Sequence, residues 1–477
     1  MAYKDTREYI DALEKEGELV RVKKEVDWDL EAGAIVRRTC EKKGPAVLFE
    51  NITDYPGSRI FGAPVATQKR LAVAMGISPD ATPNMILEDW LAKSPGRVKP
   101  VVVDKAPCQQ NVATGDKIDL SIFPTAMVHD GDGGRFIGTW HSLVTKDFDT
   151  DWTNWGMYRV MIHNKRYLGA MLLPHSEAIR MSVKWEAAGK NMPCAVAIGG
   201  DPISTIMGAV PVGPGISECD VAGAIRGEPV ELVKAKTVDL LVPAGAEIVI
   251  EGEIVRGVQV DEGPFGEFTG FRTGPRAPRA LIKVSCITWR DDPILIMSNM
   301  GVPQDDSHIV TGFLGMPTLL KPMLERERIP FTGISCPPEM AELVVIVGVK
   351  KPYNHIAMQV AHAIYGSVAM MGHIQKLIVV DETVDPFNLN EVLRALATQC
   401  HPQRGIITFP SYGGALLPYL SLQERLWGNS AIAVFDCTFP LEWDPNNEKP
   451  IVVSFGNIYP EDIQKKVLDN WKDYGFK

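Results

Sequence analysis

The pattern of apolar residues changes along this chain of 477 residues, and the changes limit the folds that it can adopt. From about residue 101 to 310, short β-branched runs such as AEIVIEGEIV and ALIKVSCITW are separated by glycine and proline. This pattern is typical of an antiparallel sheet or barrel. After Gly315, strand-like runs such as KLIVVDE alternate with helix-like runs such as NHIAMQVAHAIYG, which predicts a βαβ sheet buried on both faces. Because one core rarely serves so long a chain, we predict several domains.

The first hundred residues mix helix signals with short strands. Asp5 and Glu8 fit a capping box, Ile10 and Leu13 share one helix face, and Gly17 is placed to end the helix. The run AVLFENI predicts a strand, and residues 85–93 predict a second helix. This part of the chain is therefore expected to form an α/β portion.

The last residues predict a separate helix. In PEDIQKKVLDNWKDYGF, Ile463, Val467 and Trp471 lie on one stripe, which could dock onto another domain or subunit. We predict four parts: residues 1–100 as an N-terminal α/β portion, 101–314 as the central β domain, 315–452 as a C-terminal α/β domain, and 453–477 as a helical tail.

Composition excludes several classes of protein. Hydrophobic residues make up 45% of the chain and charged residues 23%, as in ordinary globular proteins, and the net charge is −10. This charge argues against a general nucleic-acid or anionic-membrane surface, although a local basic pocket for a phosphate or carboxylate remains compatible with it. The start of the chain has no apolar core of signal-peptide length, so we expect a cytoplasmic protein.

Eight cysteines are scattered along the chain without a CxxC pair. This spacing indicates neither a disulfide framework nor a zinc ribbon. We expect reduced and mostly buried thiols, with a nucleophilic cysteine as the less favoured alternative.

The run DEGPFGEFTGF carries two acids, Glu262 and Glu267, on either side of GPFG. Glycine and proline favour a turn or strand end, which would hold the two carboxyls near one another. Two acids in a partly dry site cannot both ionise cheaply, so one would keep its proton near neutral pH and the other would act as a base or electrostatic partner. The alternative is a surface turn with two solvated acids.

Further polar residues of the central segment could converge with this turn. Arg159, in NWGMYR, could pair with an acid and grip a substrate carboxylate, or could lie on the wet face of a sheet. Asn154, His175 and Glu218 form a mixed nitrogen and oxygen set that suits Mg²⁺ or Mn²⁺, although each could equally be structural.

A third grouping, PQDDSHIVTG, places Asp305, Asp306 and His308 beside a glycine-containing turn. These side chains could hydrogen-bond a ring substituent of a substrate, or could form a solvated acidic loop. The C-terminal half lacks a GxGxxG or GxxxxGK[ST] motif after its strands, so packing or oligomerisation is the better expectation for it than nucleotide binding.

Five motifs, which follow one another along the chain as they do in the family, give the chain a resemblance to a known family. EGPFGEFTG, NWGMYR, LPHSEAIRM, SECDVAGAIRGEPVELV and KLIVVDETVDPFN resemble those of the UbiD-like decarboxylases, which use prenylated FMN to remove carboxylate from aromatic and α,β-unsaturated acids. The likeness covers essentially the whole chain. It implies an α+β and α/β multidomain fold: a central flavin-binding split β-barrel, an N-terminal α/β portion, and a C-terminal α/β oligomerisation domain joined by a hinge.

The resemblance also implies roles for individual residues. Arg159, Glu262 and Glu267 match the family's catalytic trio, and Asn154, His175 and Glu218 match the residues that hold Mn²⁺ (or Mg²⁺) against the cofactor phosphate. A K⁺ ion would be held partly by main-chain carbonyls of Trp155 and of the MGAVP turn around Gly208. The full set implied to bind the cofactor is Asn154, Trp155, Gly156, Met157, Tyr158, Arg159, His175, Glu218 and Lys376, of which Lys376 would contact phosphate.

The implied reaction is a reversible, non-oxidative decarboxylation of an aromatic or heteroaromatic acid through a covalent adduct with prenylated FMN. Arg159 would align the acid and pair with Glu262, and Glu267 would donate the proton that replaces CO₂. The partners implied are the small aromatic acid, CO₂, a flavin prenyltransferase that supplies the cofactor, and further copies of the chain in a dimer or hexamer. The alternative, a non-catalytic subunit of a multi-subunit carboxylase, would be expected to lack Arg159 or one glutamate.

Two runs bear on the substrate. HDGDGGRF, residues 129–136, and GVPQDDSH resemble those of members that act on hydroxylated or heterocyclic aromatic acids more than those that act on cinnamate-like acids. Asp306 and His308 would then be contacts on the substrate side.

Overall fold

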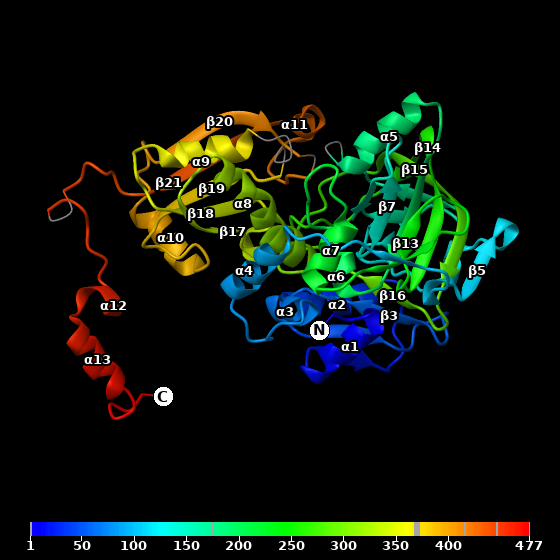
Figure 1. Ribbon diagram of the computed structural model, residues 1–477, viewed down its shortest axis with the longest axis horizontal. Helices are drawn as coiled ribbons and strands as arrows, with labels where there is room; N and C mark the ends of the chain where they lie inside the picture. Colours follow the sequence, from blue (N-terminus) through cyan, green and yellow to red (C-terminus); the bar gives the residue numbers. More distant parts are fainter. Residues whose placement is uncertain (1, 174–175, 367–372, 415, 445–446, 477) are drawn as a thin grey trace.

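The chain folds into three successive α/β and β units followed by a helical tail that stands apart from them (Figure 1). The structure is a computed structural model that describes residues 2–173, 176–366, 373–414, 416–444 and 447–476. None of the helices in these residues is long and apolar enough to cross a membrane. The multidomain α/β architecture agrees with the expectation from the sequence.

The N-terminal unit packs its helices against a four-stranded sheet whose order is β1-β2-β3-β16. Its elements are α1 (Thr6–Lys15), β1 (Leu19–Val22), α2 (Glu31–Glu41), β2 (Ala46–Phe49), β3 (Arg59–Gly62), α3 (Gln68–Ala74), α4 (Pro83–Lys93) and β16 (Ile294–Met297). Strand β16 corrects one expectation, because its run PILIMSN lies within residues 101–314, which the sequence predicts to form the central β domain. It pairs in parallel with β3 and is buried along its whole length, so it completes the N-terminal sheet instead.

Helix α1 connects this unit to the rest of the molecule. Asp5 caps the helix by accepting from the backbone amides of Arg7 and Glu8, but the Glu8 carboxylate accepts from the Lys4 amide, so the reciprocal bond of a capping box is not made. Tyr9 donates to the Pro64 carbonyl oxygen at 2.8 Å. Thr6 donates to the Gly200 carbonyl oxygen at 2.9 Å.

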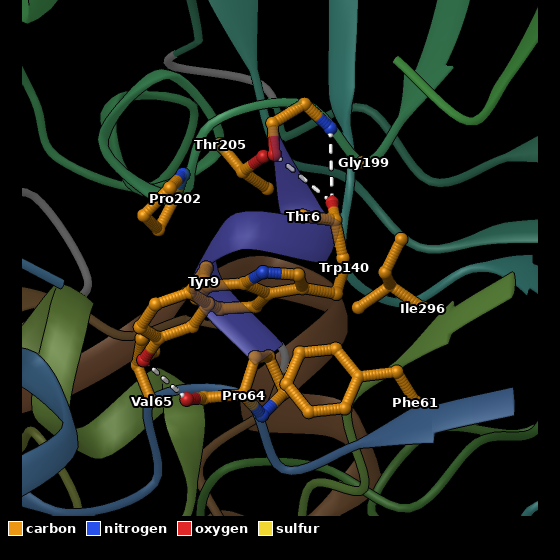
Figure 2. Close-up of a pocket in the computed structure, with 11 residues that line it drawn as sticks. Thr6, Tyr9, Phe61, Pro64, Val65, Trp140, Gly199, Pro202, Thr205 and Ile296 are labelled. Carbon is orange, nitrogen blue, oxygen red and sulfur yellow. Dashed lines mark hydrogen bonds between the residues drawn. The ribbon is translucent and has the colours of Figure 1, made fainter. Parts of the chain in front are cut away.

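A cavity of about 20 Å³ lies beside α1, between Tyr9, Phe61, Trp140 and Ile296 (Figure 2). A space of this size accommodates about one water molecule. None of the predicted catalytic residues lines it, so it is a packing gap at the joint between two units and not a substrate site.

The central unit is a curled nine-stranded sheet in the order β6-β9-β10-β15-β14-β11-β7-β8, with β5 paired to β15. Its long strands β14 and β15 pair with two register shifts, one of them between Ile254 and Gln259, and such irregularities bend a sheet. A small sheet in the order β13-β12-β4 lies beside it. The strands are β4 (Val101–Val103), β5 (Asn111–Thr114), β6 (Phe136–Gly138), β7 (Ser142–Lys146), β8 (Thr153–Gly156), β9 (Val160–Ile162), β10 (Tyr167–Ala170), β11 (Met192–Ile198), β12 (Glu231–Lys234), β13 (Leu241–Pro243), β14 (Ile248–Glu262) and β15 (Ala277–Trp289).

Helices α5 (Glu177–Ala187), α6 (Pro202–Met207) and α7 (Glu218–Arg226) complete this unit, and short helical turns lie in connections between elements along the chain. These turns are η1 (Pro107–Gln109), η2 (Gly115–Lys117), η3 (Leu120–Ile122), the π-helical η4 (His308–Gly315) and η5 (Pro338–Met340).

The C-terminal unit is a five-stranded sheet in the order β17-β18-β19-β21-β20. The strands β18, β19 and β21 are parallel, as predicted from the alternating pattern, whereas the edge strands β17 and β20 are antiparallel to their neighbours. Side chains of β20 alternate between exposed and half-buried, and β21 is buried on one face only, so burial on both faces holds for β18 and β19. The elements are α8 (Met316–Arg326), β17 (Phe331–Ser335), β18 (Val344–Val349), α9 (Ile356–Tyr365), β19 (Lys376–Asp381), α10 (Leu389–Thr398), β20 (Ile406–Tyr412), α11 (Leu422–Trp427) and β21 (Asn429–Cys437).

The tail carries α12 (Phe455–Ile458) and α13 (Glu461–Asp469) away from the three units (Figure 1). No residue of either helix is buried. Ile463 is 40% exposed, and Trp471 follows the end of the helix and stacks on Phe476. The helix therefore ends before the last residue of the predicted stripe, and it does not dock onto another domain of the described chain.

Candidate active site

Arg159 lies in the short connection between two strands of the central sheet. Strand β8 ends at Gly156 and β9 begins at Val160. A side chain at Gly156 would collide with the ring of Tyr158, because its Cβ would lie 2.4 Å from Cε2 of that ring. Glycine at this position therefore allows the chain to turn and to direct Arg159 toward the neighbouring strands.

The two acids of the GPFG turn, residues 262–267, meet this arginine. Glu262 is the last residue of β14, so the turn begins where the strand ends, as the sequence predicted. Nε and one terminal nitrogen of Arg159 donate to the two oxygens of Glu262, both at 2.8 Å. The other terminal nitrogen donates to Glu267 in a short hydrogen bond. One guanidinium therefore bridges two carboxyls that come from opposite ends of the turn.

Both acids are removed from solvent. Glu262 is fully buried and Glu267 is 5% exposed, which excludes a solvated surface turn. Burial raises the pKa of Glu267 to about 7, against the opposing attraction of Arg159. Near neutral pH this carboxyl can hold or release a proton, which is the property that proton transfer requires.

The predicted metal set is only partly described. Asn154 lies on β8, and Glu218 is the first residue of α7, where its carboxylate accepts from the Trp155 amide at 3.0 Å. His175 lies outside the described residues. Within the described residues, no cluster of three or more His, Cys, Asp or Glu could hold a metal ion.

The surroundings of Asn154 and Glu218 nevertheless suit a cation beside an anionic group. The Asn154 amide nitrogen is buried and has no hydrogen-bond partner in the described structure, so it could donate to an acceptor such as a phosphate oxygen. Glu218 is 5% exposed, and burial raises its pKa to about 8, against the hydrogen bond from Trp155. A buried carboxylate with this pKa lacks the positive charge that would keep it ionised, so a bound cation is compatible with it.

Lys376, implied to bind the cofactor, and Gly208, implied to bind K⁺, lie in different units. Lys376 begins β19 in the C-terminal unit, and its amino nitrogen lies 4.8 Å from the ring centre of Tyr419. Burial lowers the pKa of Lys376. Gly208 follows α6 in the central unit and approaches the Ser142 side chain.

The acidic cluster that follows β16 is buried and not a solvated loop. Asp305, Asp306 and His308 are fully buried. His308 pairs with Asp305 at 2.9 Å and contacts the Phe268 carbonyl oxygen at 2.7 Å, one residue from Glu267. Burial opposes charge on this imidazole, but Asp305 outweighs it and raises the pKa of His308 to about 9. Asp306 instead accepts from the Val65 amide, in the N-terminal unit.

One group of residues beside the trio was missed from the sequence. The Phe268 ring stacks on His373 at 5.7 Å and packs against Leu343, Leu417 and Leu420 of the C-terminal unit. At least 75 residues separate Phe268 from each of these positions, which form no local pattern with it, so nothing in the sequence alone indicated the contact.

Family models match nearly all of the chain. Residues 99–303 match the model described as the 3-octaprenyl-4-hydroxybenzoate carboxy-lyase Rift-related domain of UbiD. Residues 10–90 match the N-terminal domain of that carboxy-lyase, and residues 309–437 match its C-terminal domain.

Individual relatives cover the same length. The pyrrole-2-carboxylic acid decarboxylase of Pseudomonas aeruginosa is 32% identical over 99% of this chain and 98% of its own. Vanillic acid decarboxylase of Sedimentibacter hydroxybenzoicus, in its closed form, is 30% identical with a TM-score of 0.89 over 99% of both chains. An evolved dimeric form of the UbiD-class enzyme HmfF of Pelotomaculum thermopropionicum, in complex with prFMN, is 27% identical with a TM-score of 0.81 over 97% of this chain and all of its own.

Proposed function

The chain belongs to the UbiD family of carboxy-lyases, and we propose that it catalyses the reversible, non-oxidative decarboxylation of an aromatic or heteroaromatic acid with prenylated FMN as its cofactor. The observation that carries this proposal is the bridge from Arg159 to the buried carboxyls of Glu262 and Glu267. A non-catalytic subunit would have no use for a desolvated acid that exchanges its proton near neutral pH.

Arg159 aligns the substrate. Of its five N–H groups, three donate to the two glutamates, which leaves one on each terminal nitrogen. These two form a fork that matches a carboxylate, so Arg159 can hold the reacting acid in a fixed orientation. Glu262 binds the guanidinium through both of its oxygens and thereby fixes its plane.

Glu267 supplies the proton. When the bond to the carboxylate carbon breaks, CO₂ leaves, and the electron pair of that bond must be held until the ring carbon is protonated. The Glu267 carboxyl then donates its proton to that carbon and becomes a carboxylate, and a proton from solvent restores it. In the carboxylation direction the same group removes the proton.

The residues that would hold the cofactor are those that the resemblance to the family implies. Asn154, His175 and Glu218 would bind Mn²⁺ or Mg²⁺ against its phosphate, the main chain near Trp155 and Gly208 would bind K⁺, and Lys376 would contact the phosphate directly. The unpartnered Asn154 amide and the buried Glu218 support this assignment. Prenylated FMN, when bound, supplies an electrophilic ring that accepts the electrons which no side chain can hold.

The substitution Glu267→Gln tests the proton donor. Protein made together with a flavin prenyltransferase is expected to keep its flavin absorbance but to lose CO₂ release and the exchange of deuterium from solvent into product. Glu186→Gln, on the exposed face of α5, is the matched control and is expected to keep both activities. Exchange at the wild-type rate in Glu267→Gln would contradict the role of this residue.

A screen of acids tests the substrate class. Pyrrole-2-carboxylate, vanillate and cinnamate represent heterocyclic, hydroxylated and cinnamate-like acids, and we expect release of CO₂ from one of the first two. His308, beside the trio, is the proposed contact on the substrate side, whereas Asp306, the other residue expected there, is fully buried and accepts from the Val65 amide of the N-terminal unit. A colourless protein that acts on none of these acids, with and without the prenyltransferase, would overturn the proposed reaction.

A further inference from the structure

Residues 129–136, the HDGDGGRF segment, support the catalytic turn at residues 262–267. The Gly133 amide donates to the Pro264 carbonyl oxygen at 2.7 Å. Asp132 accepts from the Gly266 amide through Oδ1 at 3.1 Å. Arg276 joins the two segments by donating to the carbonyl oxygens of Gly263 and Gly133 at 3.2 and 2.8 Å. The segment therefore contacts the backbone on which both catalytic glutamates are mounted.

His129 lies at the centre of these contacts, between oxygens on both sides of its ring. Nδ1 is 2.9 Å from Oδ2 of Asp132. Nε2 is 2.8 Å from Oδ1 of Asn299 and 2.9 Å from the Met300 carbonyl oxygen. The Asn299 amide nitrogen donates to the Gly33 carbonyl oxygen, which fixes the oxygen of that side chain toward the imidazole.

Only a protonated imidazole satisfies this arrangement. A neutral imidazole has one N–H, so one of its nitrogens would direct a lone pair at an oxygen acceptor. An imidazolium donates from both nitrogens and meets an acceptor on each side. Burial opposes the charge on His129, but the Asp132 carboxylate outweighs it and raises the pKa of the imidazole.

Other charged groups lie around His129 and Asp132, and they come from several elements. Asp130 lies on the same segment, and Arg272 donates to its carbonyl oxygen. Arg37, from α2, donates to the Asn299 carbonyl oxygen and to Asp305. The Asp132 side chain is fully buried, so the imidazolium is the charged group in direct contact that compensates it.

The imidazole also abuts the turn directly. It lies edge-on to the Phe265 ring at 5.5 Å, and Arg159 lies 5.8 Å from the centre of that ring. A Cβ on Gly266 would lie 2.6 Å from Cε1 of His129, so the turn and the imidazole leave no space between them.

We propose that His129 and Asp132 are a positioning pair that holds Gly266, and thereby the neighbouring Glu267, in register with Arg159. The proposal rests on the proposed role of Glu267 as proton donor. The imidazolium pairs with the buried Asp132 carboxylate and orients it, and Asp132 in turn binds the Gly266 amide. Without the positive charge the carboxylate is buried and uncompensated, and the turn loses its anchor.

The protonation state of His129 can be measured without any substrate. In protein labelled with ¹⁵N-histidine, the shifts of the two ring nitrogens distinguish an imidazolium from both neutral tautomers. We expect His129, assigned by the loss of its signals in His129→Gln, to be an imidazolium at about pH 7 and to lose this state in Asp132→Asn. A neutral His129 in the wild-type protein would overturn the proposal even if the enzyme is active.

Kinetics test the consequence for catalysis. With an acid that the wild-type enzyme decarboxylates, His129→Gln and Asp132→Asn are each expected to lower kcat roughly tenfold to a hundredfold, with KM changed much less, because the proton donor is misplaced. The exposed His163→Asn is the control and is expected to behave as wild type. The double variant His129→Gln/Asp132→Asn is expected to be no slower than the slower single variant, because the two residues act as one unit.

Independent effects of the two substitutions on kcat would overturn the proposal. If the losses in the two single variants multiply in the double variant, or if KM rises while kcat is unchanged, His129 does not act through Asp132 on the proton donor. Failure of the proposed reaction is distinguishable from this result, because it would leave the enzyme inactive while the ring-nitrogen measurement still gives its own answer.

Discussion

Glu262 and Glu267 share one guanidinium and differ in how they are bound to it. Glu262 receives two hydrogen bonds from Arg159, one at each oxygen, whereas Glu267 receives one. Their jobs therefore separate at the level of single atoms: one acid fixes the arginine, and the other keeps an oxygen available for a proton. This division is the physical basis of the proposed reaction.

Proton donation is expected to depend on pH through Glu267. Because the pKa of Glu267 is raised to about 7, the carboxyl is protonated below that pH and ionised above it. The rate of decarboxylation, where the acid form acts, should therefore fall as pH rises through about 7. The pH dependence of kcat for the identified acid checks this, and a rate that falls instead near the ordinary pKa of glutamate, about 4.3, would contradict it.

At the scale of elements, the catalytic turn depends on a close approach of two backbones. A Cβ on Gly133 would lie 1.8 Å from the Gly263 carbonyl oxygen, so no side chain fits between the segments. Gly133 of HDGDGGRF is thus explained by packing against the turn, which is a different reason from the substrate preference that the motif indicated.

Gly133→Ala is expected to displace the turn. Because the clash is with backbone, neither partner can move aside as a flexible side chain would, and kcat should fall roughly a hundredfold with a lower Tm. Gly274→Ala is the matched control, since a Cβ there meets nothing within 4 Å. Wild-type kcat and Tm in Gly133→Ala would show that the close contact between the two backbones is not required.

At the scale of the whole molecule, Phe268 joins the catalytic turn to the C-terminal unit. It follows Glu267 directly and contacts His373 together with a cluster of leucines. Phe268→Ala should weaken this contact, increase the radius of gyration measured by small-angle scattering, and lower kcat about tenfold or more. Phe271→Ala, on the same loop but 59% exposed, is expected to change neither quantity. An unchanged radius of gyration and an unchanged kcat in Phe268→Ala would show that this contact does not join the catalytic turn to the C-terminal unit in a way that matters for the reaction.

The tail is expected to act between copies of the chain. Val453 and Leu468 are 80% and 61% exposed, and neither α12 nor α13 has a buried residue. Removal of residues 453–477 should therefore leave Tm of the monomer unchanged but reduce the mass of the oligomer measured by light scattering. A truncated chain with the wild-type mass would exclude the tail from assembly.

Local patterns predicted much of the fold. The helix at Asp5, the strand that ends at Glu262 and the alternating C-terminal elements all appear where the sequence placed them. The error at β16 has a clear cause, because a short apolar run shows that a strand is buried but not which sheet it joins.

The candidate site was predictable as a set of residues but not as an arrangement. Resemblance to the family identified Arg159 and the two glutamates, and it led to the prediction of His308 as well. No sequence signal indicated that His308 would contact Phe268, or that Asp306 would face the N-terminal unit. Such contacts join residues that are far apart in the chain, and sequence patterns extend over only a few positions.

By itself the sequence determined the local elements, the chemical identity of the proposed catalytic side chains and the family, because caps, alternation and turn residues act over short distances. The tertiary structure alone decided which groups meet and in which state. Arg159 reaches carboxyls 103 and 108 residues away, and burial then raises the pKa of one of them to about 7. Proton affinity depends on the solvent and charges around a group, and only the folded chain defines those surroundings.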